Sequence, residues 1–272
     1  MHPQLVNKLV TILKDEGSEN PVLESRLLYS HLLEFDPQNR ANFQTHLDKH
    51  LRQIKKKIPV QRQLGFTRIN KLIIKITKDV LLPGPEIEVL INACFDNIKN
   101  PKKIIDLCTG SGVVAIVLGK KFKQAKILAT DISEEALNIA KINARLNNIN
   151  NINFLRSDLF QSISDRGINK VDLIVSNPPY CRSKDIGKLP SQIKLFTPRI
   201  AIDGGPDGLF FHRIIINQSK NYLKKNGFLV LENEVGQSKI LKSLLINAGY
   251  RVIKVYKNVK NEERVIVAKK TL

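Results

Sequence analysis

The first sixty residues carry their apolar positions at helical spacing. Five leucines recur at intervals of about one turn, at Leu23, Leu27, Leu28, Leu32 and Leu33. This pattern predicts three helices, over residues 3–16, 21–35 and 39–57, with an Asp-Pro pair at 36–37 ending the second. We therefore expect residues 1–60 to fold as a small helical bundle.

A segment with alternating apolar residues follows this bundle. Between residues 67 and 82, Leu72, Ile74 and Ile76 fall on one side of an extended chain, which predicts a short β-hairpin. We assign residues 61–86 to a linker that contains this hairpin.

From about residue 87 to the end, short apolar runs alternate with helical stretches. The predicted strands cover residues 104–107, 126–130, 152–155, 171–176, 227–232, 251–256 and 264–268. Strands that alternate with helices are typical of a mainly parallel sheet covered by helices. The last two strands are joined by a short connection, which predicts a hairpin with one antiparallel strand. The fold class is therefore α/β.

The composition is that of a globular chain with two parts. A length of 272 residues allows one large core and a small accessory domain, and 42% hydrophobic with 25% charged residues is ordinary for a soluble protein. No apolar run approaches the length of a membrane helix, and the first ten residues lack the apolar core of a signal peptide, so we expect a cytoplasmic protein. The three cysteines are scattered without metal-ligand spacing, so no metal site is predicted.

The formal net charge of +19 is the strongest departure from average composition. Such a charge is typical of surfaces that bind phosphates, including surfaces that face the ribosome. The lysines are nevertheless spread along the chain, in groups at residues 55–57, 102–103, 120–121, 224–225 and 269–270. We therefore favour a generally basic surface over a dedicated nucleic-acid site.

A glycine loop between the first strand of the sheet and the next helix is a candidate ligand site. Residues 104–112 form an apolar strand that enters a turn with Gly110 and Gly112. Glycines at this place let the backbone approach a ligand at a helix N-terminus, as in dinucleotide sites. The loop contains no Lys or Arg for a pyrophosphate, so a nucleoside that carries an amino acid fits it better.

The next two predicted strands end in carboxylates. Asp131 lies 19 residues beyond Gly112, a spacing that suits hydrogen bonds from both hydroxyls of a ribose. Ser133 is placed to cap the following helix. Asp158, near the end of the third strand, is a candidate acceptor for an adenine amino group. Parallel strands end at one edge of a sheet, so these groups are expected to line one site.

The fourth strand leads into Asn-Pro-Pro-Tyr at residues 177–180, the most informative loop of the chain. The prolines have a φ of about −65° and no N–H, so the local carbonyls are free to accept. An Asn oxygen, a carbonyl and an aromatic face can together hold a planar NH₂ group and leave its nitrogen lone pair usable. This predicts a site for a methyl acceptor, with a turn that only caps the strand as the alternative.

Together these motifs resemble the class I S-adenosylmethionine-dependent methyltransferases, and among them the HemK-type glutamine methyltransferases of peptide-chain release factors. The resemblance rests on segments in order along nearly the whole chain, at residues 81–88, 177–180, 197–201, 204–209 and 261–265. It implies a seven-stranded Rossmann-like sheet in residues 87–272 and S-adenosyl-L-methionine as cofactor. The reaction would be methylation of the side-chain amide nitrogen (N5) of the glutamine in a Gly-Gly-Gln motif. The bundle of residues 1–60 would recognise the substrate, with a cap that only packs against the rest of the protein as the alternative.

The resemblance also implies roles for single residues. Asn177 and the carbonyl of Pro178 would accept from the substrate amide, and Tyr180 would pack on its plane. Further substrate-binding residues would be Pro179, Pro85 and Glu88. The cofactor would be held by Asp106, Cys108, Thr109, Gly110, Ser111, Gly112, Asp131, Ile132, Asp158, Leu159 and Asn177. Release factors would be the partners, and we further expect contact with the ribosome, a monomer, no metal and no membrane contact.

Four residues depart from those usual in this family. Gly84 stands for Arg, Ile87 for Thr, Cys108 for Gly and Thr197 for Glu. The first two changes remove hydrogen-bond donors from the segment beside the active site. Cys108 adds a side chain to the glycine loop, where we expect it to take a negative φ.

Three other functions share parts of this pattern. A glutamine methyltransferase of a ribosomal protein has the same loop, but the proline-rich segment at residues 83–88 and the short N-terminal part argue against it. An adenine-N6 methyltransferase of DNA or RNA would need an aromatic, basic cleft, for which no Trp and 6% aromatic residues leave little room. A non-catalytic relic would be signalled by the four departures, but the intact residues 177–180 and Asp131 argue against it.

Overall fold

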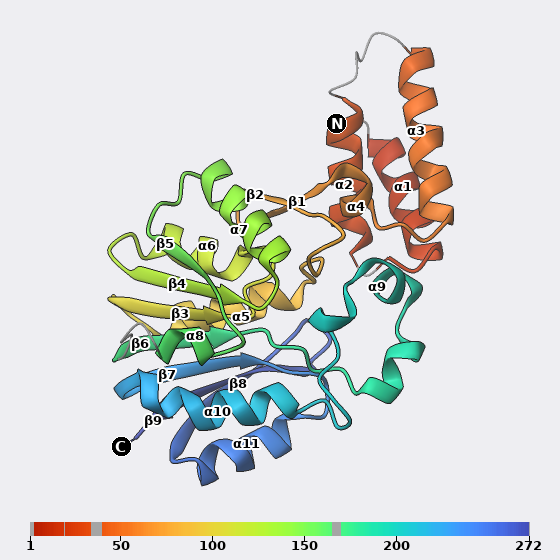
Figure 1. Cartoon of the computed structure of the whole chain (residues 1–272). Helices are drawn as coiled ribbons and strands as arrows, with labels where there is room; N and C mark the ends of the chain where they lie inside the picture. The colour runs from red at the N-terminus through yellow and green to blue at the C-terminus, as the bar shows by residue number, and fades with distance from the viewer. Residues whose placement is uncertain (1–2, 19, 34–39, 165–169, 272) are drawn as a thin grey trace.

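The computed structural model describes residues 3–18, 20–33, 40–164 and 170–271. Its N-terminal part is a helical bundle of α1 (Pro3–Asp15), α2 (Pro21–Leu32), α3 (Arg40–Lys55) and α4 (Val60–Leu64) (Figure 1). The bundle has a core of its own, made of Leu9, Leu13, Leu28, Leu32, Leu47, Ile54 and Val60. The three helices predicted from leucine spacing are confirmed. The Asp-Pro pair at 36–37 and the predicted ends at 35 and 39 lie outside the described residues.

A short antiparallel hairpin of β1 (Phe66–Ile69) and β2 (Leu72–Lys75) connects the bundle to the sheet (Figure 1). The hairpin is confirmed, but it ends well before residue 82. A turn replaces the predicted continuation, because the Asp79 N–H donates to Thr77 Oγ1 and Arg62 donates to the carbonyls of Thr77 and Val80. These backbone groups are satisfied without a strand partner.

Within the described residues, seven strands form one sheet in the order β5-β4-β3-β6-β7-β9-β8. Their bounds are β3 (Lys103–Leu107), β4 (Lys126–Asp131), β5 (Ile152–Arg156), β6 (Val171–Ser176), β7 (Leu223–Glu232), β8 (Tyr250–Lys257) and β9 (Glu263–Lys270). β9 runs antiparallel to both of its neighbours, and the other pairs are parallel. The predicted seven-stranded α/β sheet with one antiparallel strand is therefore confirmed.

Helices cover both faces of this sheet (Figure 1). One face packs against α5 (Glu86–Asn97), α6 (Val113–Lys121) and α7 (Glu134–Leu146). The other packs against α8 (Gln161–Ser164), α10 (Phe210–Tyr222) and α11 (Ser238–Asn247). The central strands are apolar on both faces, which explains their continuous apolar runs.

The connection from β6 to α10 crosses the edge of the sheet where the parallel strands end. It contains η1 (Ser183–Lys188), α9 (Ser191–Phe196) and η2 (Arg199–Ala201). In Figure 1, α9 lies between this edge and the helical bundle. None of the helices in the described ranges has the length and hydropathy needed to cross a bilayer.

Candidate functional site

Two cavities meet at the edge of the sheet where the parallel strands end. The first, of about 360 Å³, lies over the ends of β3, β4, β5 and β6. The second, of about 760 Å³, lies between the helical bundle, the segment before α5, α9 and the sheet. The residues that line both cavities are Leu81, Pro83, Ile87, Asn177 and Ala201. A molecule in either cavity therefore lies beside these shared residues.

The end of β3 shapes the glycine loop through a buried carboxyl group. Asp106 is 1% exposed, and its Oδ2 accepts from Thr109 Oγ1 at 2.6 Å and from the Ala115 N–H at 3.1 Å. Burial raises the pKa of Asp106 to about 7. These two hydrogen bonds fix the loop against the first turn of α6.

Gly112 stands apart from the other residues of this loop because it does not line the first cavity. It has a φ of +81° at the start of α6, and a β-carbon there would lie 2.8 Å from Cβ of Ala140. Its role is to let α6 begin against α7. Thr109, Gly110 and Ser111 do line the cavity.

The expectation that Cys108 has a negative φ is wrong, because its φ is +56°. The chain turns sharply here so that the next N–H, of Thr109, reaches the carbonyl of Thr130 at the end of β4. The Cys108 side chain packs against the apolar core on the α10 side and lines the first cavity. Burial raises the pKa of its thiol, so it lines the cavity as a neutral group.

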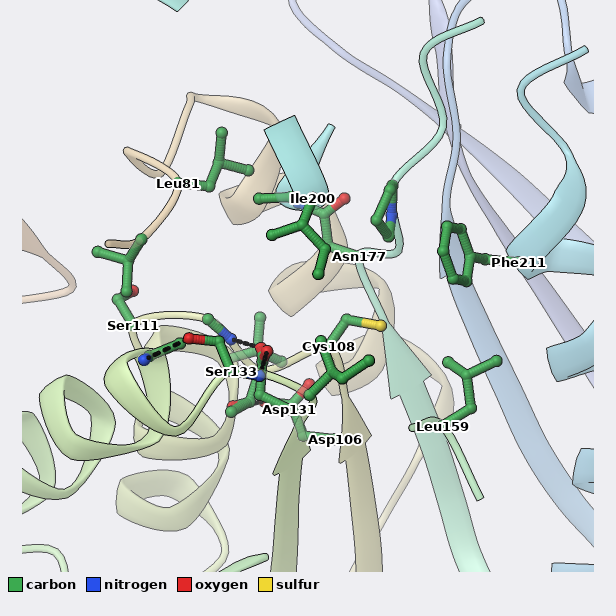
Figure 2. Close-up of a pocket in the computed structure, with 18 of the residues that line it drawn as sticks. Leu81, Asp106, Cys108, Ser111, Asp131, Ser133, Leu159, Asn177, Ile200 and Phe211 are labelled. Atoms are coloured by element: carbon green, nitrogen blue, oxygen red, sulfur yellow. Dashed lines mark hydrogen bonds between the residues drawn. The ribbon is translucent and has the colours of Figure 1, made fainter. Parts of the chain in front are cut away.

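Asp131 at the end of β4 faces the glycine loop. Its Oδ2 accepts from the Gly110 N–H at 2.8 Å and its Oδ1 from the Ser133 N–H at 3.0 Å. A carboxylate has about four lone-pair sites, so capacity remains for a ligand in the cavity. Burial raises the pKa of this carboxyl group. In Figure 2, Cys108 lies between Asp131 and Asn177.

The end of β5 completes the same cavity. Asp158 and Leu159 line it, and Ile132 extends the lining from the end of β4. Phe210, Phe211 and Ile214 of α10 form an apolar wall of this cavity that was not predicted from the sequence. Nothing in the sequence connects this helix to the cavity, because it reaches the site only through the fold.

The loop after β6 divides its residues between the two cavities. Asn177 lines both, Pro179 lines the first, and Pro178 and Tyr180 line the second. Pro179, which we expected on the substrate side, thus lies beside the first cavity. The loop begins at a fixed place because Ser176 Oγ donates to the Leu107 carbonyl of β3 at 2.8 Å.

The segment before α5 forms the wall between the cavities. Glu86 and Glu88 lie in the first turn of α5, where the helix dipole favours them. Pro85 and Glu88 line the second cavity. Of the positions that depart from the resemblance, Gly84 and Thr197 also line the second cavity, and the buried Ile87 lines both.

Asn143 is a residue that sequence analysis missed. It is fully buried on α7, where its Nδ2 donates to the Ser111 carbonyl at 2.9 Å and to the Lys75 carbonyl at 3.1 Å. Its Oδ1 accepts from the Lys75 N–H at 2.7 Å. Asn143 therefore ties the hairpin to the glycine loop. The available signal was a single polar residue within the apolar side of the helix.

The described residues contain no group of three or more His, Cys, Asp or Glu side chains placed to hold a metal ion. The polar groups of the first cavity are instead carboxylates, hydroxyls and loop backbone from four strand ends. Such a set suits a neutral or cationic nucleoside derivative better than a phosphate.

Comparison with known proteins identifies several relatives. The model of the family "Methyltransferase small domain" matches residues 86–192. A release factor glutamine methyltransferase of Thermodesulfovibrio yellowstonii is 36% identical over 248 residues, covering 90% of this chain and 86% of that protein. A release factor glutamine methyltransferase of Clostridium acetobutylicum is 32% identical, and the match covers 96% of this chain and 95% of that protein. A crystal structure of a methyltransferase from Pyrococcus furiosus has a similar fold, with a TM-score of 0.58 and 19% sequence identity. The match covers 75% of this chain and 91% of that one.

Proposed function

The chain belongs to the release factor glutamine methyltransferase family, and we propose that it methylates N5 of the glutamine in the Gly-Gly-Gln motif of peptide-chain release factors. S-adenosyl-L-methionine is the methyl donor. The observation that carries this proposal is the place of Asn177, which lines both cavities. One side chain is thereby in reach of a donor in the first cavity and an acceptor in the second.

The first cavity would hold the cofactor. Asp131 would accept from the ribose hydroxyls, and Asp158 with Leu159 would contact the adenine. The glycine loop would lie against the amino-acid part. When bound, S-adenosylmethionine supplies a methyl group on a positively charged sulfur, which keeps the bonding electron pair when the methyl is displaced in line.

The second cavity would hold the glutamine side chain. Asn177 Oδ1 and the Pro178 carbonyl would accept the two amide hydrogens, and the Tyr180 ring would pack on the amide plane. These contacts orient the nitrogen lone pair toward the methyl group and exclude water, so no covalent nucleophile is needed. One amide hydrogen stays on the nitrogen, hydrogen-bonded to Asn177 Oδ1, until alkylation makes the nitrogen acidic enough to lose this proton to solvent.

We further propose that the helical bundle contributes to recognition of the release factor. Asn20 and Gln61 of the bundle region line the second cavity together with Tyr180. Because its substrate acts in translation, the enzyme would work in the cytoplasm, and its basic surface would favour contact with the ribosome. We further propose that it works as a monomer. The reaction proposed here uses no metal.

A methyl-transfer assay tests the function. Labelled S-adenosylmethionine is offered with a purified release factor and with its Gln→Ala variant at the Gly-Gly-Gln tip, and mass spectrometry maps the product. Label on the wild-type factor alone is the expected result. Label on neither factor, while the cofactor still binds, would contradict the proposal. Ribosomal protein and nucleic acid would then be tested as acceptors, and failure of these too would indicate a relic without activity.

A further inference from the structure

Three adjacent strands deliver a connected set of polar side chains to the second cavity. Tyr180 follows β6, Glu232 ends β7 and Arg264 lies in β9, and these strands are consecutive in the sheet. Glu232 pairs with Val265 in the antiparallel register, which brings Arg264 close to it. All three side chains line the second cavity.

The hydroxyl group of Tyr180 is held from two sides. It donates to Glu232 Oε1 at 3.1 Å and accepts from Arg264 Nη2 at 3.0 Å. The guanidinium carbon of Arg264 also lies 5.7 Å from the centre of the Tyr180 ring. A tyrosine hydroxyl has a single hydrogen, and here that hydrogen is committed to Glu232. What Tyr180 can offer to a substrate is therefore the face of its ring.

This network is not explained by a contribution to the stability of the fold. Glu232 is 2% exposed, and its Oε2 and the Nε of Arg264 have no hydrogen-bond partner among the described residues. Apolar side chains in place of a buried ion pair are often as stabilising or more so. A buried carboxyl group and a largely buried guanidinium on one hydroxyl are better explained by the precision that they give to Tyr180.

We propose that Glu232 and Arg264 are positioning residues that fix the Tyr180 ring, by its hydroxyl, at the angle needed for the acceptor amide. This role rests on the function proposed above. A ring anchored only at its Cβ can rotate about two side-chain torsions, whereas hydrogen bonds at its far end remove that freedom. Small losses of alignment in a group that orients a nucleophile lower the rate of transfer without lowering cofactor affinity.

The test measures kcat and KM for methylation of a purified release factor by the full-length enzyme. Tyr180→Phe keeps the ring and removes the hydroxyl, and Glu232→Ala removes the acceptor. We expect each to lower kcat about tenfold with an unchanged KM for S-adenosylmethionine. The variant that combines Tyr180→Phe with Glu232→Ala should be no slower than the slower of the two single variants, because both changes remove the same interaction. Glu232→Gln keeps an acceptor oxygen and should stay within about threefold of the wild type.

Tyr250→Phe is the matched control for effects on stability. Tyr250 is a buried tyrosine whose hydroxyl is likewise hydrogen-bonded, 2.7 Å from Ser219 Oγ, and it packs in the core on the α11 side of the sheet. Its loss should lower the unfolding temperature but leave kcat unchanged.

Several results would overturn the positioning role. One is a wild-type kcat in Glu232→Ala, and another is a Tyr250→Phe variant as slow as Tyr180→Phe. A third is a double variant whose loss of kcat equals the product of the two single losses, in which case Glu232 would act on the acceptor itself. A wild-type enzyme that leaves the release factor unlabelled would instead contradict the proposed function, and the positioning role would fall with it.

Discussion

The carbonyl oxygen of Tyr180 lies against the α-carbon of Gly208, with no room for a side chain between them. Gly208 has a φ of +76°, and a β-carbon there would overlap this oxygen. Gln237 Nε2 donates to both carbonyls, at 3.0 Å for Tyr180 and 3.3 Å for Gly208. The glycine-rich segment at residues 204–209 therefore packs against the loop that carries Asn177 and supports it.

Gly208→Ala should consequently distort the loop and lower both stability and turnover. The strained φ alone costs about 1 to 3 kcal/mol, and the overlap adds to it. Urea unfolding and the methyl-transfer assay measure the two losses. Gly187→Ala is the control, because Gly187 has open space around its α-carbon and no positive φ. Equal behaviour of the two variants would contradict the assigned packing role.

Asn177→Ala should bind S-adenosylmethionine nearly as well as the wild type but lose turnover by roughly 100-fold to 1,000-fold, because an oriented acceptor for the amide is removed. Calorimetry gives the affinity and the labelled assay gives the rate. Asn153→Ala changes an exposed Asn on the edge strand β5 and should have no effect. Wild-type turnover in Asn177→Ala would refute the catalytic role of this residue.

Asp131→Ala should have the opposite profile and weaken cofactor binding by roughly 2 to 4 kcal/mol, as expected for loss of a pair of charge-assisted hydrogen bonds. Titration calorimetry with S-adenosylmethionine is the measurement. Glu134→Ala removes a carboxylate three residues away that pairs with Lys141 at the surface, so it controls for general electrostatic effects. If the two variants bind the cofactor equally well, the ribose role of Asp131 is wrong.

His212 should make the protein less stable in acid. The ring is fully buried, with Nε2 2.8 Å from the Glu232 carbonyl, and burial lowers its pKa from 6.5 to about 4. Between these two values the unfolded chain binds the proton and the folded protein does not, so stability falls as pH falls from 6.5 to 4. The loss amounts to about 3 kcal/mol.

Comparison with His212→Gln isolates this contribution. Burial raises the pKa of both Asp106 and Glu232 to about 7, so these groups act in the opposite direction, and stability falls as pH rises from about 4 to 7. Both proteins contain them, so they largely cancel in the difference. Urea unfolding at pH 7 and pH 4.5 should show the wild type losing more stability than the variant on acidification. A difference that does not change with pH would contradict the burial of a neutral ring.

Periodicity predicted the longer elements well and the short ones poorly. The strands and the three N-terminal helices have strong apolar patterns, so they were located to within a few residues. The short helices α4, α8 and α9 were not predicted, since four to six residues contain too little periodicity to identify. The start of β7 at Leu223, four residues before the predicted start, depends on its pairing with Val171 of β6, which no local pattern reports.

The sequence by itself determined which groups stand at the ends of the strands, because strand ends follow from local patterns and parallel strands end at one edge of a sheet. It could therefore predict that Asp131, Asp158 and Asn177 approach one another. Only the tertiary structure decided that the Asn-Pro-Pro-Tyr loop at residues 177–180 contributes residues to two cavities and that Cys108 takes a positive φ. It also decided that β9 lies between β7 and β8, which joins Arg264 to Tyr180. These features depend on contacts between residues far apart in the chain, and the spacing of neighbouring residues carries no record of them.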